Sequence, residues 1–374
     1  MSHIVIVVQN LKIGGFQRIA LDQCYAFAAR KISVELIALE RIEGDDRNNF
    51  IYLEKDLIHK FKIRIKYSTG NRLMQYKYFY RMMRTSVEPI EFLSHSLRAS
   101  VLIRLAGLLQ KKNYYVNSTI HQIPSLSDSL QIKKRFFYAL FSHRLFIFSA
   151  QAKQDWEARI SKSLLLRILF LRKPIKLLRN GVFLDRLPPL LIPTLEVCRP
   201  EVRLVFIGRP TSWKGVSTIL RLAEFDVMDK AQLIFYFPYQ NESVFKGTPR
   251  KIVERVNIEV GKSIRDYNPK LGDIHLYPAN YGIESSYIES ISINCLEMSA
   301  IGVPSLVTKG GLSTWPEFAN SPLIYEVDWS NLEEIARKII DIHRSSIAYG
   351  EILRLRSLID INQHIEQLIT FTKN

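Results

Sequence analysis

Residues 289–311, ESISINCLEMSAIGVPSLVTKGG, place two carboxylates eight positions apart around an expected helix start. Ser292 and Asn294 lie between the two acids, and such side chains accept hydrogen bonds from the free amides of a first helical turn. A phosphate near Ser292 and Ile293 would meet these amides and the positive end of the helix dipole. The stretch therefore predicts an anion site with a carboxylate, Glu289 or Glu297, on either side.

The helix in this stretch is expected to end at Gly302 and Pro304, because glycine and proline commonly follow a helix end. Residues 305–308 are suited to a buried parallel strand, and Gly310 and Gly311 after them would let the backbone approach a ligand. A helix followed by a buried strand is typical of an α/β protein.

The length of 374 residues exceeds one ordinary core, so two domains are expected. An apolar fraction of 47% favours a globular protein, and no run reaches the roughly 18 apolar residues of a spanning helix. The opening MSHIVIVVQN lacks the features of a signal peptide and predicts a first strand. Three widely spaced cysteines are typical of a reducing cytoplasm and offer no metal framework.

Charge is unevenly distributed along the chain. Residues 1–180 carry 31 Lys and Arg against 13 Asp and Glu, a net charge of +18, whereas the remainder carries −2 of the total of +16. A half this basic is expected to meet an anionic partner, and the candidates are nucleic acid, a membrane surface and a phosphorylated acceptor.

The N-terminal half alternates expected strands and helices. Residues 4–8 predict a strand, followed by a glycine loop and a helix that extends to Ala29. Gly14 and Gly15 in this loop are either a structural turn or a ligand contact, and His121 after a later strand is either a packed or a catalytic residue. Both places follow strands, where parallel sheets bind their ligands.

Residues 71–84, NRLMQYKYFYRMMR, mix basic residues with aromatic residues and methionines. Two interpretations remain open for this stretch: an interfacial helix that binds anionic lipid, or a core helix with a solvated basic face. Residues 132–148, in which three basic residues precede FFYALF, favour the membrane interpretation slightly.

A turn signal at Asn180 and Gly181 and a proline-rich passage after it predict a domain boundary. The second half begins with the strand pattern VRLVFIG, followed by a polar loop that contains Arg209 and Lys214. These cations either bind a diphosphate together or are ordinary solvated charges.

Four segments follow one another along the chain: NLKIGGFQR at residues 10–18, RNGV at 179–182, GRPTSWKG at 208–215, and Glu289 and Glu297 with GVP following. In this order they resemble the retaining nucleotide-sugar glycosyltransferases of family 4, which have the GT-B fold. The resemblance extends over nearly the whole chain, and the order and spacing of the segments make it specific.

The resemblance implies an α/β protein with two Rossmann-like domains facing each other across a cleft. We expect an acceptor-binding N-terminal domain at 1–182, a linker at 183–200, a nucleotide-sugar-binding domain at 201–345 and a helical tail at 346–374. A C-terminal helix is expected to cross back to the N-terminal domain.

The same resemblance assigns residue roles in donor binding. Arg209 and Lys214 would neutralise the donor diphosphate, together with the helix start at Ser292 and Ile293. Glu297 would accept hydrogen bonds from the ribose hydroxyls.

Two further residues are implied in catalysis, Glu289 at the hydroxyls of the transferred sugar and His121 at the cleft. Gly14 and Gly15 would bring backbone amides near the phosphate or sugar. No protein nucleophile is assigned, and no metal or other cofactor is expected, because the cations and the helix start would stabilise the departing diphosphate.

These features predict a cytoplasmic glycosyltransferase, a hexosyltransferase, peripheral on the inner face of the cell membrane. It would use a nucleotide sugar, UDP rather than GDP, to extend a lipid-linked glycan acceptor in surface polysaccharide, O-antigen or lipopolysaccharide synthesis. The basic half would contact the anionic membrane and no nucleic acid. Two alternatives remain open: a nucleotide-sugar epimerase of the same fold, and a non-enzymatic basic module that binds anionic lipid or nucleic acid.

Overall fold

A computed structural model describes residues 3–11, 14–41, 55–68, 70–108, 110, 113–120, 129–191, 201–279 and 291–373. The chain divides into two compact units, each with its own parallel sheet. Unit 1 comprises Met1–Gly181 and Ile361–Asn374, and unit 2 comprises Val182–Asp360.

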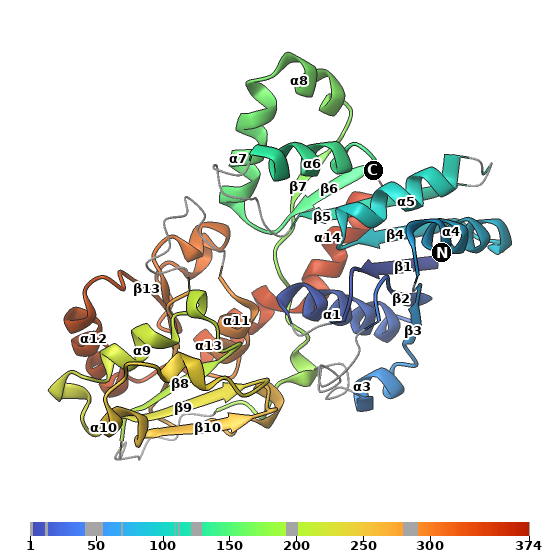
Figure 1. Cartoon of the computed structure of the whole chain (residues 1–374). Coiled ribbons are helices and arrows are strands. Elements are labelled where there is room, and N and C mark those ends of the chain that lie inside the picture. The colour runs from blue at the N-terminus through green and yellow to red at the C-terminus, as the bar shows by residue number, and fades with distance from the viewer. Residues whose placement is uncertain are drawn as a thin grey trace. The chain divides into compact units, whose positions relative to one another are not determined.

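Unit 1 is a doubly wound α/β unit (Figure 1). Its elements are β1 (His3–Val8), α1 (Gly15–Ala29), β2 (Val34–Ala38), α3 (Lys55–Lys60), β3 (Arg64–Tyr67), α4 (Arg72–Thr85), β4 (Ile90–Ser94), α5 (Leu97–Leu108), β5 (Tyr114–Ile120), α6 (Ser129–Ala139), β6 (Arg144–Ile147), α7 (Ala150–Ser161), α8 (Leu164–Phe170), β7 (Ile175–Leu177) and α14 (Ile361–Lys373).

The described sheet of unit 1 has the order β3-β2-β1-β4-β5-β6-β7, and every pair of neighbours is parallel. Strand β1 is apolar on both sides, as expected for a strand whose two faces are covered by helices. Val5 and Val7 pack with α4 and α5 in one core cluster, which includes the buried Phe79 and Ile103. The strand order reverses between β1 and β4, so this is the point where a ligand is expected.

Unit 2 is built in the same way on a second parallel sheet. Its elements are the 3-10 turn η2 (Leu184–Arg186), β8 (Arg203–Ile207), η3 (Ser212–Lys214), α9 (Val216–Leu222), η4 (Asp226–Met228), β9 (Gln232–Phe237), η5 (Glu242–Phe245), α10 (Arg250–Val253), β10 (Val256–Val260), η6 (Ile264–Asp266), β11 (Asp273–Tyr277), α11 (Ile293–Ala300), β12 (Ser305–Thr308), η7 (Gly311–Thr314), η8 (Pro316–Phe318), β13 (Ile324–Val327), α12 (Leu332–Arg344) and α13 (Tyr349–Ile359).

The described sheet of unit 2 has the order β10-β9-β8-β11-β12-β13. Its core is formed by strand side chains such as Phe206 and Phe235 together with α9 and α12. In α12 the residues Leu332, Ile335 and Ile339 are buried at helical spacing, which explains why this segment is an amphipathic helix. The order reverses between β8 and β11, which makes their carboxyl ends the expected ligand site.

The C-terminal residues are divided between the two units. Helix α13 belongs to unit 2, whereas α14 returns to unit 1 and packs against α1, as expected for a C-terminal helix that crosses back. Buried His364 holds α14 in place, because its Nε2 lies 2.9 Å from Gln23 Nε2 and its Nδ1 lies 2.6 Å from the carbonyl oxygen of Arg179. Among the described residues, no helix is both long and apolar enough to cross a membrane.

Candidate functional site

Three chain segments converge at the strand-order reversal of unit 2. Gly208 and Arg209 follow β8, Pro278 follows the neighbouring strand β11, and α11 begins nearby. Asn294 in the first turn of α11 donates a hydrogen bond from Nδ2 to the carbonyl oxygen of Ile207 at 2.6 Å. This bond holds the start of α11 at the carboxyl end of β8.

Gly215 fixes the loop that joins β8 to α9. Its φ angle is +75°, and a Cβ at this position would lie 2.6 Å from the carbonyl oxygen of Pro278. Both the left-handed backbone and the close approach favour glycine here. The glycine therefore lets the loop after β8 pack against the segment after β11.

Arg209 and Lys214, the two predicted diphosphate ligands, share one aromatic partner in this loop. The guanidinium carbon of Arg209 lies 5.3 Å and the ammonium of Lys214 lies 4.0 Å from the ring centroid of Trp213. Lys214 is only 9% exposed, and its ammonium also donates a hydrogen bond to the hydroxyl of Tyr277 on β11. The structure thus gathers two cations at the sheet edge, one half-buried and one buried between aromatic rings.

The start of α11 has the geometry that its sequence predicts. Ser292 is the N-cap, and its side chain accepts a hydrogen bond from the amide of Asn294 at 3.2 Å. Ile293 is the first helical residue, and Ile291 before the cap is held by a 3.0 Å backbone bond to Gly311. The predicted helix start is confirmed, whereas its anion-binding role stays a prediction.

Glu297 lies on the buried side of α11. Its side chain is 2% exposed and forms an ion pair with Arg186 of η2, whose side chain is 0% exposed. Sequence analysis did not identify Arg186, because the two residues are 111 positions apart. In this conformation the carboxylate that the resemblance assigns to ribose is bound to an arginine of the same unit.

His275 lies on β11, two residues before Tyr277. It is fully buried, and its Nδ1 lies 3.1 Å from the hydroxyl of Ser305 on β12. Burial lowers the pKa of this imidazole to about 3, so the ring is neutral at physiological pH. It therefore adds no charge to β11 next to Tyr277.

Gly14 and Gly15 lie at the corresponding place in unit 1, between β1 and α1. Gly14 is the N-cap of α1 in extended conformation, and Gly15 is its first helical residue. A Cβ added at Gly15 would meet no atom within 4 Å. Nothing in the described part of the chain therefore requires glycine at this position, which leaves the ligand-contact interpretation open.

Polar side chains surround the strand-order reversal of unit 1. Glu40 after β2 accepts hydrogen bonds from both Gln9 and Asn10 after β1. Gln9 in turn accepts a 3.2 Å bond from the hydroxyl of Ser96 after β4. These side chains follow the carboxyl ends of three neighbouring strands. In the sequence, the only signal for them is that each one comes shortly after a strand pattern.

A second group of polar side chains in unit 1 connects a partly buried histidine, His95, with the buried His364. Gln23 of α1 lies between His95, at 2.8 Å, and His364 of α14, at 2.9 Å. Burial lowers the pKa of His95 to about 3 and that of His364 to about 4, so both rings are neutral. All three side chains belong to unit 1, so these hydrogen bonds fasten α14 to the rest of that unit.

Two of the predicted residues, Glu289 and His121, lie outside the described residues. Their catalytic roles therefore remain predictions. Within the described ranges, no group of three or more His, Cys, Asp or Glu side chains could hold a metal ion.

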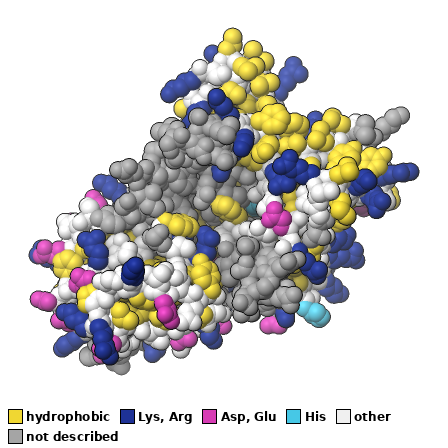
Figure 2. Space-filling model, in the orientation of Figure 1, with side chains coloured by type: hydrophobic (Ala, Val, Ile, Leu, Met, Phe, Trp, Pro, Cys, Tyr) yellow, Lys and Arg dark blue, Asp and Glu magenta, His cyan; other side chains and the backbone are white. Residues whose placement is uncertain are grey.

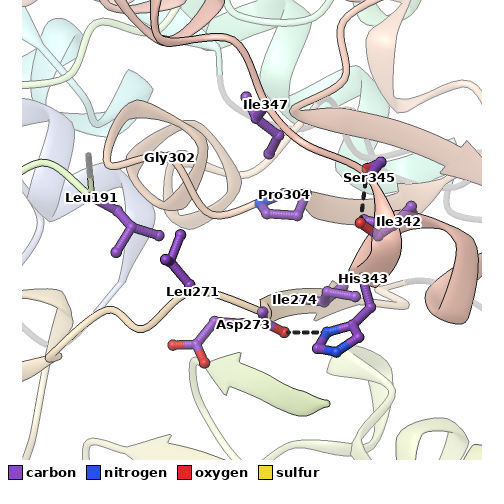
Figure 3. A pocket seen from close by; sticks show the side chains of 11 residues that line it. Leu191, Leu271, Asp273, Ile274, Gly302, Pro304, Ile342, His343, Ser345 and Ile347 are labelled. Atoms are coloured by element: carbon purple, nitrogen blue, oxygen red, sulfur yellow. Dashed lines mark hydrogen bonds between the residues drawn. The ribbon is translucent and has the colours of Figure 1, made fainter. Parts of the chain in front are cut away.

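A small pocket in unit 2 lies away from the site described above (Figure 3). Gly272 and Asp273 line it at the start of β11, Pro304 lies just before β12, and His343 comes from the end of α12. The pocket therefore lies at the amino ends of the strands, and parallel sheets bind ligands at the opposite edge. We do not assign it to the predicted anion site.

Comparison with known proteins gives matches only among solved structures. No protein-family model matches the chain, and no curated protein sequence matches it. The structure of HepE from Anabaena with UDP and glucose is similar, with 14% identity, a TM-score of 0.68 and coverage of 99% of this chain and 100% of that chain.

Two further solved structures are similar over the whole chain. Sucrose-phosphate synthase from Thermosynechococcus elongatus has 14% identity and a TM-score of 0.66, covering 100% of this chain and 98% of its own. The lipopolysaccharide outer core galactosyltransferase WaaB has 12% identity and a TM-score of 0.63, covering 100% of both chains. The chain thus has the α/β GT-B fold with two Rossmann-like domains, as the sequence resemblance implied.

Proposed function

We propose that the protein is a retaining glycosyltransferase that transfers a hexose-type sugar from a nucleotide sugar, UDP rather than GDP, to a lipid-linked glycan. The product would belong to a surface polysaccharide, an O-antigen or a lipopolysaccharide. The enzyme would work in the cytoplasm, peripherally on the inner face of the cell membrane. Unit 2 would bind the donor, and unit 1 would bind the acceptor.

The convergence at the carboxyl ends of β8 and β11 is the observation that carries this proposal. Arg209 and Lys214 supply two cations there, and the start of α11 is fixed beside them by Asn294. A diphosphate matches this arrangement, because it can accept hydrogen bonds from both cations and from helix amides at once.

The ligand or activity named for two of the similar structures supports the proposal. HepE was solved with UDP and glucose, and WaaB is a galactosyltransferase of the lipopolysaccharide outer core. HepE was also solved with UDP-glucose, so a nucleotide sugar is a known ligand of a protein with this fold. We propose the same substrate classes for this chain.

Leaving-group stabilisation would be the main catalytic device. Breaking the bond between sugar and phosphate develops negative charge on the departing diphosphate, and preorganised cations and amides lower the energy of that state. Tyr277 would hold the Lys214 ammonium in position through their hydrogen bond. With these groups in place we expect the reaction to need neither a protein nucleophile nor a metal ion.

The remaining roles follow the family resemblance. Glu289 would bind the hydroxyls of the transferred sugar, His121 would act beside it, and Gly15 would bring an amide near the donor. Glu297 has two interpretations, since its ion pair with Arg186 also fits a purely structural role in fastening η2 to α11. The ribose contact stays our proposal.

Lys214→Ala tests the donor site by titration calorimetry with UDP and GDP. Losing a charge-assisted hydrogen bond costs about 1.5–3 kcal/mol, so we expect UDP affinity to fall by roughly 10- to 150-fold. Lys262→Ala is the control, because Lys262 is an exposed lysine of the same unit. Equal UDP affinity in both variants would contradict the proposed site.

The alternatives are separated with the same protein. UDP-sugar binding followed by conversion of the sugar without transfer would indicate the epimerase. Salt-sensitive binding of anionic lipid or nucleic acid without any nucleotide affinity would indicate a basic binding module.

A further inference from the structure

Helix α8 and the residue after it carry a concentrated exposed apolar surface. Five large side chains make up this α8 surface: Leu164, Leu165, Ile168, Leu169 and Leu171, exposed by 72%, 65%, 62%, 40% and 80%. Among the described residues only twenty large hydrophobic side chains are this exposed, and a quarter of them lie within these eight positions. Such a concentration marks an interaction site, whereas single exposed apolar side chains need no explanation.

The α8 surface is held in a defined orientation by the opposite face of the helix. Phe170 is 5% exposed, and its ring centroid lies 5.8 Å from that of Phe136 and 6.3 Å from that of Trp156. Leu166, one turn earlier, packs against the same cluster, and Ser163 caps the helix by accepting a bond from the Leu166 amide. The exposed leucines are therefore presented by a packed helix, and their exposure does not come from a frayed end.

Positive charge surrounds the α8 surface. Lys162, Arg167, Arg172 and Lys176 are all exposed, and the sequence contains no acidic residue from position 158 to 184. Figure 2 shows hydrophobic side chains flanked by Lys and Arg over the region where Figure 1 places α8. The combination of apolar side chains with cations alone is typical of a segment that binds an anionic membrane interface.

We infer that the α8 surface inserts into the headgroup region of an anionic bilayer. The leucines would enter the boundary of the acyl chains, and the four cations would contact lipid phosphates. Seven helical residues span only about 10 Å, so insertion is shallow and the helix does not cross the bilayer. A second copy of the chain is disfavoured as the partner, because the same cations would then face each other.

This inference rests on the proposed function and makes it more specific, because it names the element by which the acceptor-binding unit reaches lipid-linked acceptors. It also differs from the sequence-based expectation. In α4 (Arg72–Thr85), which covers most of residues 71–84, Gln75, Phe79 and Met83 form one buried face, as the core-helix interpretation expects. The membrane contact is instead assigned to residues 164–171, which the sequence analysis did not single out.

Vesicle co-sedimentation tests the α8 surface directly. The full chain is mixed with vesicles of phosphatidylcholine alone or with one quarter phosphatidylglycerol. We expect binding to the anionic vesicles, and we expect Leu164→Ser/Ile168→Ser/Leu171→Ser to lower the partition coefficient roughly 30-fold or more, because three apolar side chains no longer enter the lipid. Arg167→Glu/Arg172→Glu should lower binding to anionic vesicles about tenfold or more.

A matched control variant is Val227→Ser/Val260→Ser/Leu353→Ser, which removes three exposed apolar side chains of unit 2 and should bind vesicles as the native chain does. UDP affinity should be the same in all variants. If the α8 leucine variant no longer binds vesicles while neither the native chain nor any variant binds UDP, the inference is supported and the proposed donor is refuted. The inference would be overturned if the native chain does not bind anionic vesicles or if the α8 leucine variant binds them as the native chain does. It would also be overturned if light scattering shows that the α8 surface mediates dimerisation.

Discussion

Replacing Arg186 with methionine should destabilise unit 2 strongly. The change removes the cation and keeps most of the side-chain volume, so Glu297 remains as a carboxylate that is 2% exposed without its ion-pair partner. Removing one partner of a buried ion pair typically costs about 3–5 kcal/mol. In a unit of about 180 residues each kcal/mol lowers the melting temperature by about 2–4 °C, so we expect a decrease of about 6–20 °C.

The assay is thermal unfolding measured by scanning calorimetry, with Arg250→Met as the control. Arg250 and Glu254 also form an ion pair, but their side chains are 92% and 62% exposed. Such an exposed pair contributes at most about 0.5 kcal/mol, so the control should unfold within about 2 °C of the native protein. An equally small decrease for Arg186→Met would refute the argument that the buried pair stabilises unit 2.

The double variant Arg186→Met/Glu297→Leu separates the two interpretations of Glu297. Replacing both members of a buried pair by apolar residues is often nearly neutral, so we expect most of the lost stability to return. If Glu297 also contacts the ribose, this stable variant should bind UDP weakly. Normal UDP affinity in the double variant would leave Glu297 with a structural role alone.

Two further predictions concern backbone geometry and pH. Gly215→Ala should lower the melting temperature by more than Gly261→Ala. Both glycines have positive φ, but of the two only Gly215 would place its new Cβ 2.6 Å from an atom of Pro278. Equal decreases in melting temperature would show that the close packing of this loop on Pro278 does not matter for stability. His275 has a folded pKa of about 3 and an unfolded pKa near 6.5, so the unfolded chain binds more protons between these values. The stability that neutral, buried His275 contributes is therefore fully present above about pH 6.5 and falls by up to about 1.4 kcal/mol per pH unit below it. His275→Phe should make the free energy of unfolding less dependent on pH between pH 7 and 5. An unchanged pH dependence in this variant would contradict the lowered pKa of His275.

The central strands and the donor loop could be predicted from sequence because they depend on local signals. The predicted strand at 305–308 coincides with β12, and the one at 4–8 lies within β1, since a buried parallel strand is a short apolar run. The edge strands β3, β10 and β13 were not predicted. In the described sheets β3 and β10 have largely exposed residues and each pairs with a single neighbour, so their sequences lack the apolar pattern.

The parts of the candidate site that sequence analysis missed depend on distant contacts. The partner of Glu297 is Arg186, and no spacing rule connects residues in a proline-rich boundary to a helix of the following sheet. The α8 surface was missed for a related reason. The pattern LLLRILF suits a buried helix, and only the packing of Phe170 and Leu166 on one face shows that the other leucines are exposed.

The central claim is that a nucleoside diphosphate binds at the carboxyl ends of β8 and β11. Hydrogen–deuterium exchange of the full chain with and without saturating UDP measures this most directly. We predict that UDP slows exchange in the peptides that cover residues 208–215 and 292–300, and that Lys214→Ala removes this protection. UDP protection confined to other peptides, or no protection at a concentration where UDP binds, would contradict the claim.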